Sequence, residues 1–517
     1  MPDMDRPNFL IVMTDHQRWD TTVPEHPCIT PNLTKLAAEG VSFTHTYCPM
    51  AHCSPARATF FSGLYPTRTG VWNNVGNDYA IGRGPHEHVK MFSEDLREAG
   101  YDLAYAGKWH VSALGTQTPK RYGWRELTKY GQTIQDGHQK WEQIRRTADD
   151  PGNADAKIQM PGFQPHDLYG VAENGDKGDR RSMDLAMAEL PKLADGGKPW
   201  ALYLGWNGPH APYKVPQRYL DMYDVADVEL PKSYFDDMAD KPDYYGKLRR
   251  ATFDQLGEER TKDAIRHFWA YCTMLDEMFG EVMAALEQTG QADNTVVLYC
   301  ADHGDYVGEH GLFHKQVPSF LGGYRVPAIA RWPKGVRHPG RRVEEFVSLA
   351  DFAPTYLELG GVQPERYHTG RSLVPFLRDE TPPDWRQEIC MQCEGTEQHF
   401  TQRQVLTKTH KYVFNGFGRD ELYDMTRDPD EIHNQIDNPE HDEAKRDLVG
   451  RMWQFAYLEQ DRLGQTQYIM VNTAPWGPKE GFRDGKGDGL GHAVRIGEEN
   501  DPEAVRRYNE TARRRVG

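Results

Sequence analysis

The sequence predicts an α/β fold, with a mostly parallel sheet sandwiched by helices and a smaller C-terminal α+β subdomain. Three observations support this prediction. Apolar runs alternate with amphipathic helical segments, and these runs are apolar throughout, as expected of strands covered on both faces. After about residue 365 the pattern changes to short strands without long helices between them. A length of 517 residues suits one large domain and a smaller unit.

The elements of the first domain are predicted from apolar runs and from residues that begin or end helices. Phe9–Met13 is a continuous apolar run and therefore a strand. Pro31 suits the first position of the next helix, which Thr30 can cap and Gly40 can end. Four further elements follow: strands over residues 101–106, 201–206 and 295–300, and an amphipathic helix over residues 264–288.

The C-terminal part is predicted to form two further units. Short strands over residues 404–415 and 421–424 indicate a small antiparallel sheet. The last segment is polar and becomes rich in Gly and Asp, which predicts contact with a partner subunit in a homo-oligomer, a dimer or a tetramer. The predicted units are a catalytic domain over residues 1–365, a subdomain over 366–438 and a tail over 439–517.

The charge balance restricts the partners of the protein. A net charge of −16 repels nucleic acid and anionic membranes, so any bound anion must be held by a local positive cluster. The run Phe9–Met13 is shorter than a signal-peptide core or a membrane span, which predicts a cytoplasmic protein with no membrane partner. The 7 cysteines do not suggest a disulfide framework, and the pair Cys390 and Cys393 lacks the second pair expected of a zinc site.

Charged and imidazole side chains follow the carboxyl ends of four predicted strands. They are Asp15 and His16, Lys108 and His110, His210, and Asp302 and His303. Ligands of open parallel sheets bind beyond these ends. One histidine after a strand is usually structural, but agreement of four strands is not expected by chance. The two carboxylates are oxygen ligands for a divalent cation, and His16 and His303 can add nitrogen. Lys108, His110 and His210 supply positive charge and proton transfer for an oxyanion.

A candidate nucleophile precedes a predicted helix. In Cys53-Ser54-Pro55-Ala56-Arg57, Pro55 marks the helix start, so Cys53 lies where free backbone N–H groups favour anionic oxygen. Arg57, one turn further on, can direct its guanidinium to the same point. A lone cysteine is usually a buried inert thiol, but this pentapeptide favours the catalytic interpretation.

These residues resemble a known family. Two segments resemble the signatures of the type I sulfatases of the alkaline phosphatase superfamily. The first signature is matched by Cys53-Ser54-Pro55-Ala56-Arg57 with Ser62-Gly63-Leu64-Tyr65-Pro66, and the second by Gly107-Lys108-Trp109-His110. The resemblance covers roughly residues 7 to 435. It continues in Pro209-His210-Ala211-Pro212, Asp302-His303-Gly304, His314-Lys315, Asp351-Phe352-Ala353-Pro354-Thr355 and Glu421-Leu422-Tyr423-Asp424.

The resemblance implies a sulfuric ester hydrolase similar to arylsulfatases and choline sulfatases. A formylglycine-generating enzyme would convert Cys53 to formylglycine, whose hydrate attacks the sulfur of a small anionic sulfate ester and forms a covalent sulfo-enzyme. The matched positions imply one divalent cation bound by Asp15, Asp302, His303 and the converted Cys53, and His16 is a fifth candidate that is either a weaker ligand or no ligand. They also imply that Arg57 holds the formylglycine oxygens, Lys108 and Lys315 bind sulfate, His110 removes a proton from the second hydroxyl, and His210 donates to the leaving oxygen.

The sequence departs from the family pattern at His16, where many sulfatases have a second Asp. An imidazole is neutral and a softer ligand than a carboxylate, which makes manganese and zinc stronger candidates for the bound metal. The resemblance still favours calcium narrowly. Related hydrolases of phosphonate monoesters and phosphodiesters are an alternative. They have Tyr and Thr in place of Lys108 and His110, yet Asn74 stands where they carry a substrate-binding Asn. The lysine and histidine favour sulfate esters.

Two other classes are less well supported. A non-catalytic binding protein on the same scaffold is disfavoured because every expected catalytic position is filled. A two-zinc phosphatase needs a second set of metal ligands and a Ser or Thr nucleophile, and neither is evident in the sequence.

Overall fold

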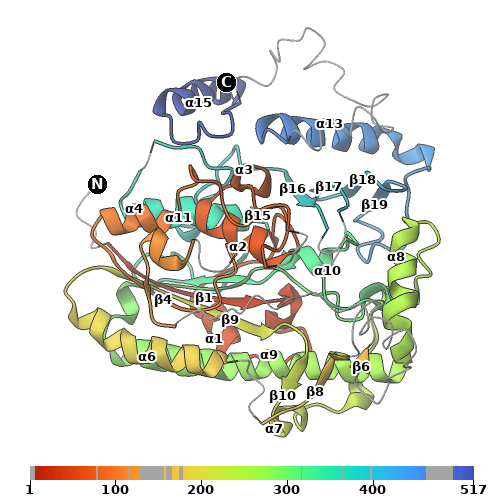
Figure 1. Cartoon of the computed structure of the whole chain (residues 1–517), viewed down its shortest axis with the longest axis horizontal. Helices are drawn as coiled ribbons and strands as arrows, with labels where there is room; N and C mark the ends of the chain where they lie inside the picture. The colour runs from red at the N-terminus through yellow and green to blue at the C-terminus, as the bar shows by residue number, and fades with distance from the viewer. Residues whose placement is uncertain are drawn as a thin grey trace.

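A central eight-stranded sheet organises the chain (Figure 1). The computed structural model describes residues 6–76, 80–113, 117–128, 157–158, 166–173, 178–315, 317–363, 365–395, 399–461 and 493–516. The strand order is β14 (Arg341–Val343), β2 (Val41–Phe43), β13 (Ala328–Arg331), β11 (Thr295–Ala301), β1 (Asn8–Asp15), β9 (Trp200–Pro209), β4 (Asp102–Gly107) and β5 (Arg125–Glu126). Strands β11, β1, β9, β4 and β5 are parallel, while β13 is antiparallel to both of its neighbours. The predicted mostly parallel α/β sheet is confirmed.

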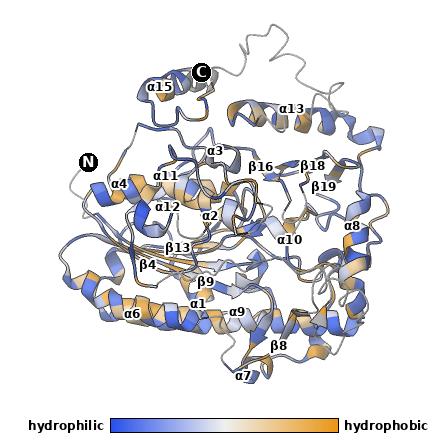
Figure 2. Cartoon of the chain, viewed as in Figure 1, coloured by the Kyte–Doolittle hydropathy of each residue, from blue (hydrophilic) through white to orange (hydrophobic). Residues whose placement is uncertain are grey.

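Both faces of the sheet are covered, which explains why its strands are apolar without alternation. Along β1, Phe9, Ile11 and Met13 pack on one side, and Leu10 and Val12 pack on the other. The first side is covered by α2 (Cys53–Ser62), α4 (Phe92–Glu98) and α11 (Phe352–Leu359), and the second by α1 (Pro31–Glu39), α6 (Asp179–Asp195) and α9 (Gly257–Gln288). Figure 2 shows hydrophilic and hydrophobic residues intermixed along α6 and α9, as expected of helices with one face on a sheet.

The predicted strands coincide with observed ones, with small shifts at their ends. The strand expected over residues 9–13 is β1, and those over 101–106, 201–206 and 295–300 are β4, β9 and β11. The helix expected over residues 264–288 begins earlier, at Gly257. Thr30 precedes α1 as predicted, but its side chain makes no capping hydrogen bond there. Its hydroxyl donates instead to the carbonyl of Thr21 (3.2 Å).

The C-terminal subdomain is a four-stranded antiparallel sheet with a helix on it. Its strands are β16 (Glu388–Cys393), β17 (Gln402–Thr407), β18 (His410–Asn415) and β19 (Glu421–Asp424), in that order. Helix α13 (Asp442–Leu458), in the segment predicted as a tail, packs on β17 and β18 through Leu448, Met452 and Trp453. This helix therefore lies within the core of the subdomain. Within the described residues, no helix is both long enough and apolar enough to cross a membrane.

The last described segments return to the catalytic domain. Helix α15 (Pro502–Val516) contributes Val505 to a small apolar cluster with Leu64, Val89 and Tyr367. The buried guanidinium of Arg68 donates to Glu459 Oε2 and to Glu499 Oε1, both at 2.8 Å. Arg68 thus joins the end of α13 to the segment before α15. The glycine-rich part of the predicted tail lies outside the described residues.

Candidate active site

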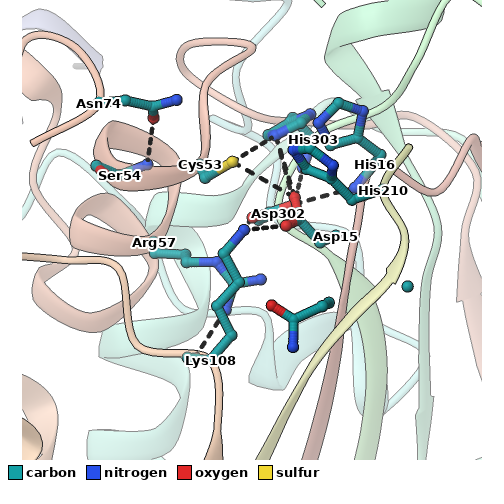
Figure 3. Close-up of polar contacts among 12 residues, drawn as sticks. Asp15, His16, Cys53, Ser54, Arg57, Asn74, Lys108, His210, Asp302 and His303 are labelled. Atoms are coloured by element: carbon teal, nitrogen blue, oxygen red, sulfur yellow. Dashed lines mark hydrogen bonds and ion pairs between the residues drawn. The ribbon is translucent and has the colours of Figure 1, made fainter. Parts of the chain in front are cut away.

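The carboxyl ends of β1, β4, β9 and β11 deliver polar side chains to one place (Figure 3). Asp15 ends β1, Lys108 follows β4, His210 follows β9, and Asp302 follows β11. The parallel pairing of these strands places their ends along a single edge of the sheet. The candidate residues come from distant parts of the sequence, so they meet only because the sheet assembles.

Cys53 lies at the centre of this group, as the first residue of α2. Its thiol is buried and faces three groups: Asp15 Oδ1 at 3.5 Å, His303 Nε2 at 3.2 Å and Lys315 Nζ at 3.5 Å. Burial and Asp15 by themselves would raise the pKa of Cys53, but Lys108 and Lys315 hold it well below its usual value. The helix N-terminus adds further positive potential. The site therefore favours negative charge on the group at position 53.

Arg57 connects α2 to the end of β11. Its side chain is fully buried, and Nε donates to Asp302 Oδ2 at 2.7 Å. Nη1 donates to the carbonyl of Lys108 and to the hydroxyl of Tyr203, both at 3.1 Å. Among the described residues, Nη2 has no hydrogen-bond partner. A buried guanidinium nitrogen without a partner is costly, which fits a site that binds an additional oxygen.

Three histidines present the same ring nitrogen to the site. Nδ1 of His303 lies 2.8 Å from a backbone carbonyl, and Nδ1 of His210 lies 2.6 Å from another. Nδ1 of His16 lies 2.9 Å from Asp305 Oδ2. These oxygens can only accept, apart from a protonated carboxyl, so each Nδ1 donates and each Nε2 faces inward. This is the orientation that metal-binding and proton-transferring histidines need.

The donor set fits a divalent cation. One ligand atom each from four residues lies within 4.8 Å of the others: Asp15, His16, Cys53 and His303. Positive side chains already approach these atoms, because the ammonium of Lys108 contacts Asp15 and that of Lys315 contacts His16 Nε2. Burial alone would raise the pKa of Asp15, but Lys108 and His210 hold it well below its usual value. Asp15 is therefore a carboxylate at neutral pH and a suitable oxygen ligand.

Asp302, the fifth predicted ligand, lies beside this group rather than within it. Its Oδ1 is 3.8 Å from His303 Nε2 and accepts from the backbone N–H of His303 at 2.9 Å. Its other oxygen is the one held by Arg57. Burial and the nearby Asp15 raise the pKa of Asp302. The same carboxylate can thus serve both the cation and the guanidinium.

The remaining predicted residues occupy two settings. His110 has a left-handed backbone (φ +50°) and interacts electrostatically with Cys53, while its buried Nδ1 has no partner among the described residues. Burial lowers the pKa of His110, which keeps the imidazole neutral and able to accept a proton. Asn74 is also close, but its Oδ1 accepts from the backbone N–H of Ser54 at 3.1 Å. That contact caps the first turn of α2.

Two residues of the site were not predicted from the sequence. Asp305 accepts hydrogen bonds on Oδ2 from His16 and from the hydroxyl of Tyr213 (2.8 Å), and it is fully buried. Burial raises the pKa of Asp305 to about 6. The sequence feature that could have identified Asp305 is its position three residues after Asp302, in the same segment beyond a predicted strand. Nothing in the sequence marks Tyr213, which follows the predicted strand over residues 201–206.

Comparisons with known proteins identify the family of the chain. The family model Sulfatase matches residues 7–362, and the model for the C-terminal part of N-sulphoglucosamine sulphohydrolase matches residues 308–457. The chain is 28% identical over 449 residues to the uncharacterized sulfatase YidJ of Escherichia coli, covering 84% of each chain. It is 28% identical over 464 residues to a choline-sulfatase of Rhizobium meliloti, covering 84% of this chain and 83% of that one.

Solved structures share the fold at lower identity. The structure of BT4656 in complex with D-glucosamine-2-N,6-O-disulfate matches with a TM-score of 0.70 and 21% identity, over 89% of this chain and 99% of that chain. The phosphonate monoester hydrolase of Agrobacterium radiobacter matches with a TM-score of 0.68 and 22% identity, over 91% and 96%. These structures show that the chain shares their overall fold.

Proposed function

The chain belongs to the sulfatase family and is a sulfatase, and we propose that it cleaves sulfate monoesters with a formylglycine formed from Cys53 and one divalent cation. The observation that carries this proposal is the position of residue 53 at a helix N-terminus, within 3.5 Å of Asp15, His303 and Lys315. The hydrated aldehyde supplies a hydroxyl nucleophile, and the bound cation supplies Lewis-acid activation of the sulfate.

The basic residues position and neutralise the substrate. The buried Nη2 of Arg57 has no hydrogen-bond partner in the described part of the chain, and we assign it to an oxygen of the residue at position 53. Lys108 and Lys315 are buried beside Cys53, and their ammonium groups are assigned to the sulfate oxygens. They form the local positive cluster that a protein of net charge −16 needs to bind an anion.

Two histidines are assigned to proton transfer. His110 interacts electrostatically with residue 53 and is kept neutral by burial, so it accepts a proton from that residue in the step that releases sulfate. His210 is assigned to the leaving oxygen. Because its Nδ1 holds a proton against a backbone carbonyl, His210 donates from Nε2 only as an imidazolium.

We propose that Asp15, His16, Asp302, His303 and the modified residue 53 hold the cation. The resemblance to sulfatases favours calcium narrowly, whereas two inward-facing imidazoles suit manganese or zinc. Metal analysis of the purified, chelator-free protein decides between them. Calcium at one equivalent supports the family expectation, and manganese or zinc that is lost in His16→Ala indicates that His16 is a ligand.

Hydrolysis of phosphonate monoesters or phosphodiesters is the second candidate function. The fold likeness to a phosphonate monoester hydrolase and the presence of Asn74 near residue 53 favour it. Lys108 and His110 favour sulfate. Steady-state kinetics on aryl sulfates and aryl phosphonate monoesters with the same leaving group tests the choice. A higher kcat/KM for the sulfate supports the proposal, and a higher kcat/KM for the phosphonate replaces it with the second function.

Maturation of Cys53 is tested by peptide mass spectrometry. We expect the peptide that contains Cys53 to carry an aldehyde or its hydrate when the protein is produced with a formylglycine-generating enzyme. Fully active protein with an unmodified thiol would contradict the proposed nucleophile. Limited proteolysis tests the proposed boundaries at residues 365 and 438, the second of which precedes a helix, α13, that packs on the subdomain. Light scattering tests the proposed homo-oligomer.

A further inference from the structure

A second group of metal-binding side chains lies on the C-terminal subdomain, apart from the catalytic edge of the large sheet. His410 is the first residue of β18, and Asp424, the last residue of β19, is its direct partner in the antiparallel ladder. Cross-strand partners project from the same face of a sheet. His441 ends the short helix η10 (Pro439–His441), just before α13. All three residues are partly buried.

The distances between these donors suit a small tetrahedral cation. His410 Nε2 and His441 Nδ1 are 3.1 Å apart, and one ligand atom from each of the three residues lies within 4.8 Å of the others. Two nitrogens bound to Zn²⁺ at tetrahedral angles are about 3.3 Å apart. The existing separation is therefore close to the bound one, so binding requires little movement of the backbone.

Neighbouring hydroxyls orient two of the donors. Nδ1 of His410 lies 3.1 Å from the hydroxyl of Thr409, which directs Nε2 toward His441. One oxygen of Asp424 accepts from the backbone N–H and the hydroxyl of Thr426, at 3.0 and 2.6 Å. Among the described residues, no hydrogen bond reaches the other oxygen, Oδ2. Thr409 and Thr426 thus orient the side chains of His410 and Asp424.

The chemistry of the three donors also indicates which cation they prefer. A set of two imidazoles and one carboxylate prefers borderline metals over calcium or magnesium.

We propose that His410, Asp424 and His441 form a zinc site, with water as the fourth ligand because the group is open to solvent. The cation would link η10 to the last two strands of the sheet. Since α13 follows η10 directly, the site would fix the start of that helix on the subdomain. This proposal does not depend on the function assigned to the catalytic site.

Zinc titration of untagged, chelator-treated protein tests the proposal. The difference in stoichiometry between the native sequence and His410→Ala is the measured quantity, because the catalytic site contributes equally to both. We expect the variant to bind one equivalent fewer by isothermal titration calorimetry. We also expect it to lose a rise in Tm of about 2 °C that the native protein shows at a zinc concentration of one hundred times Kd.

His433→Ala is the matched control, since this histidine is exposed on the same subdomain and is not part of the group. It should bind as much zinc as the native sequence. If His410→Ala does not fold, His441→Ala on the short helix η10 takes its place. Cobalt binding is a second measurement. We expect the native protein to show visible d–d absorption from Co²⁺ bound at this group and the variant to lack it. Equal zinc stoichiometry in the native protein and the His410 or His441 variant would overturn the proposed site.

Discussion

Replacing Arg68 with methionine should detach the C-terminal segments from the catalytic domain. The Arg68 side chain is fully buried and donates four hydrogen bonds, to Glu459 and Glu499 (2.8 Å each) and to the carbonyls of Leu458 (2.6 Å) and Val494 (2.9 Å). Methionine keeps much of the length of the side chain but removes its charge. Two carboxylates would then remain in a site with side-chain exposure of only 3–4%.

The expected cost follows from these contacts. Removing one partner of a buried ion pair typically costs 3–5 kcal/mol, because the remaining charge has no partner. Glu459 still accepts from the hydroxyls of Tyr367 (2.6 Å) and Thr369 (2.8 Å), which lowers the cost. We therefore expect a loss of about 3 kcal/mol, near the lower end of that range. For the exposed pair of Arg371 and Asp384, Arg371→Met should cost less than about 1 kcal/mol.

Urea unfolding followed by circular dichroism measures both costs, and limited trypsin digestion locates the change. We expect Arg68→Met to unfold at a lower urea concentration than Arg371→Met. We also expect faster cleavage within α15, since Arg68 holds the described residues just before this helix. Equal urea midpoints and equal cleavage patterns for the two variants would show that this buried arginine does not anchor the segment.

Three further predictions concern the catalytic site and the subdomain. Cys53→Ala should abolish turnover without changing the circular dichroism spectrum, and an active variant would eliminate residue 53 as the nucleophile. His110→Ala should reduce kcat by about 10²–10⁴-fold and leave a sulfated residue 53 visible by intact-protein mass spectrometry; unchanged turnover would remove its assigned role. Burial raises the pKa of Asp420 to about 6, so the folded state holds more protons than the unfolded state between pH ~4 and ~6. Stability should fall by up to about 3 kcal/mol as pH rises through that window, and Asp420→Asn should flatten this slope in urea unfolding.

The proposed anion site lies in a protein of net charge −16. The basic side chains of the site are shielded from solvent, because Arg57 and Lys108 have 0% and 6% exposure. Their charges are therefore screened little by salt and act mainly within the site. Binding of a sulfate ester should depend only weakly on ionic strength, in contrast to proteins that attract anions over long distances.

The sequence by itself determined the elements of the fold and most of the candidate residues. Strands such as Phe9–Met13 are recognisable because a strand buried on both faces is apolar at every position, which is a local property. The segment Cys53–Arg57 carries its own signal, because Pro55 predicts the start of a helix, which the structure places two residues earlier, at Cys53. The residues after the strands were expected at one edge because parallel strands end together.

Only the tertiary structure decided how these residues pair. His16 and Asp305 are 289 positions apart, and their hydrogen bond fixes which ring nitrogen His16 turns toward the site. Asn74, which the sequence offered as a substrate-binding residue, accepts a hydrogen bond from the backbone N–H of Ser54. Such pairings depend on the register and twist of the assembled sheet and on the rotamers that packing permits. No local pattern in the chain encodes them, because their energies arise only when distant segments exclude water together.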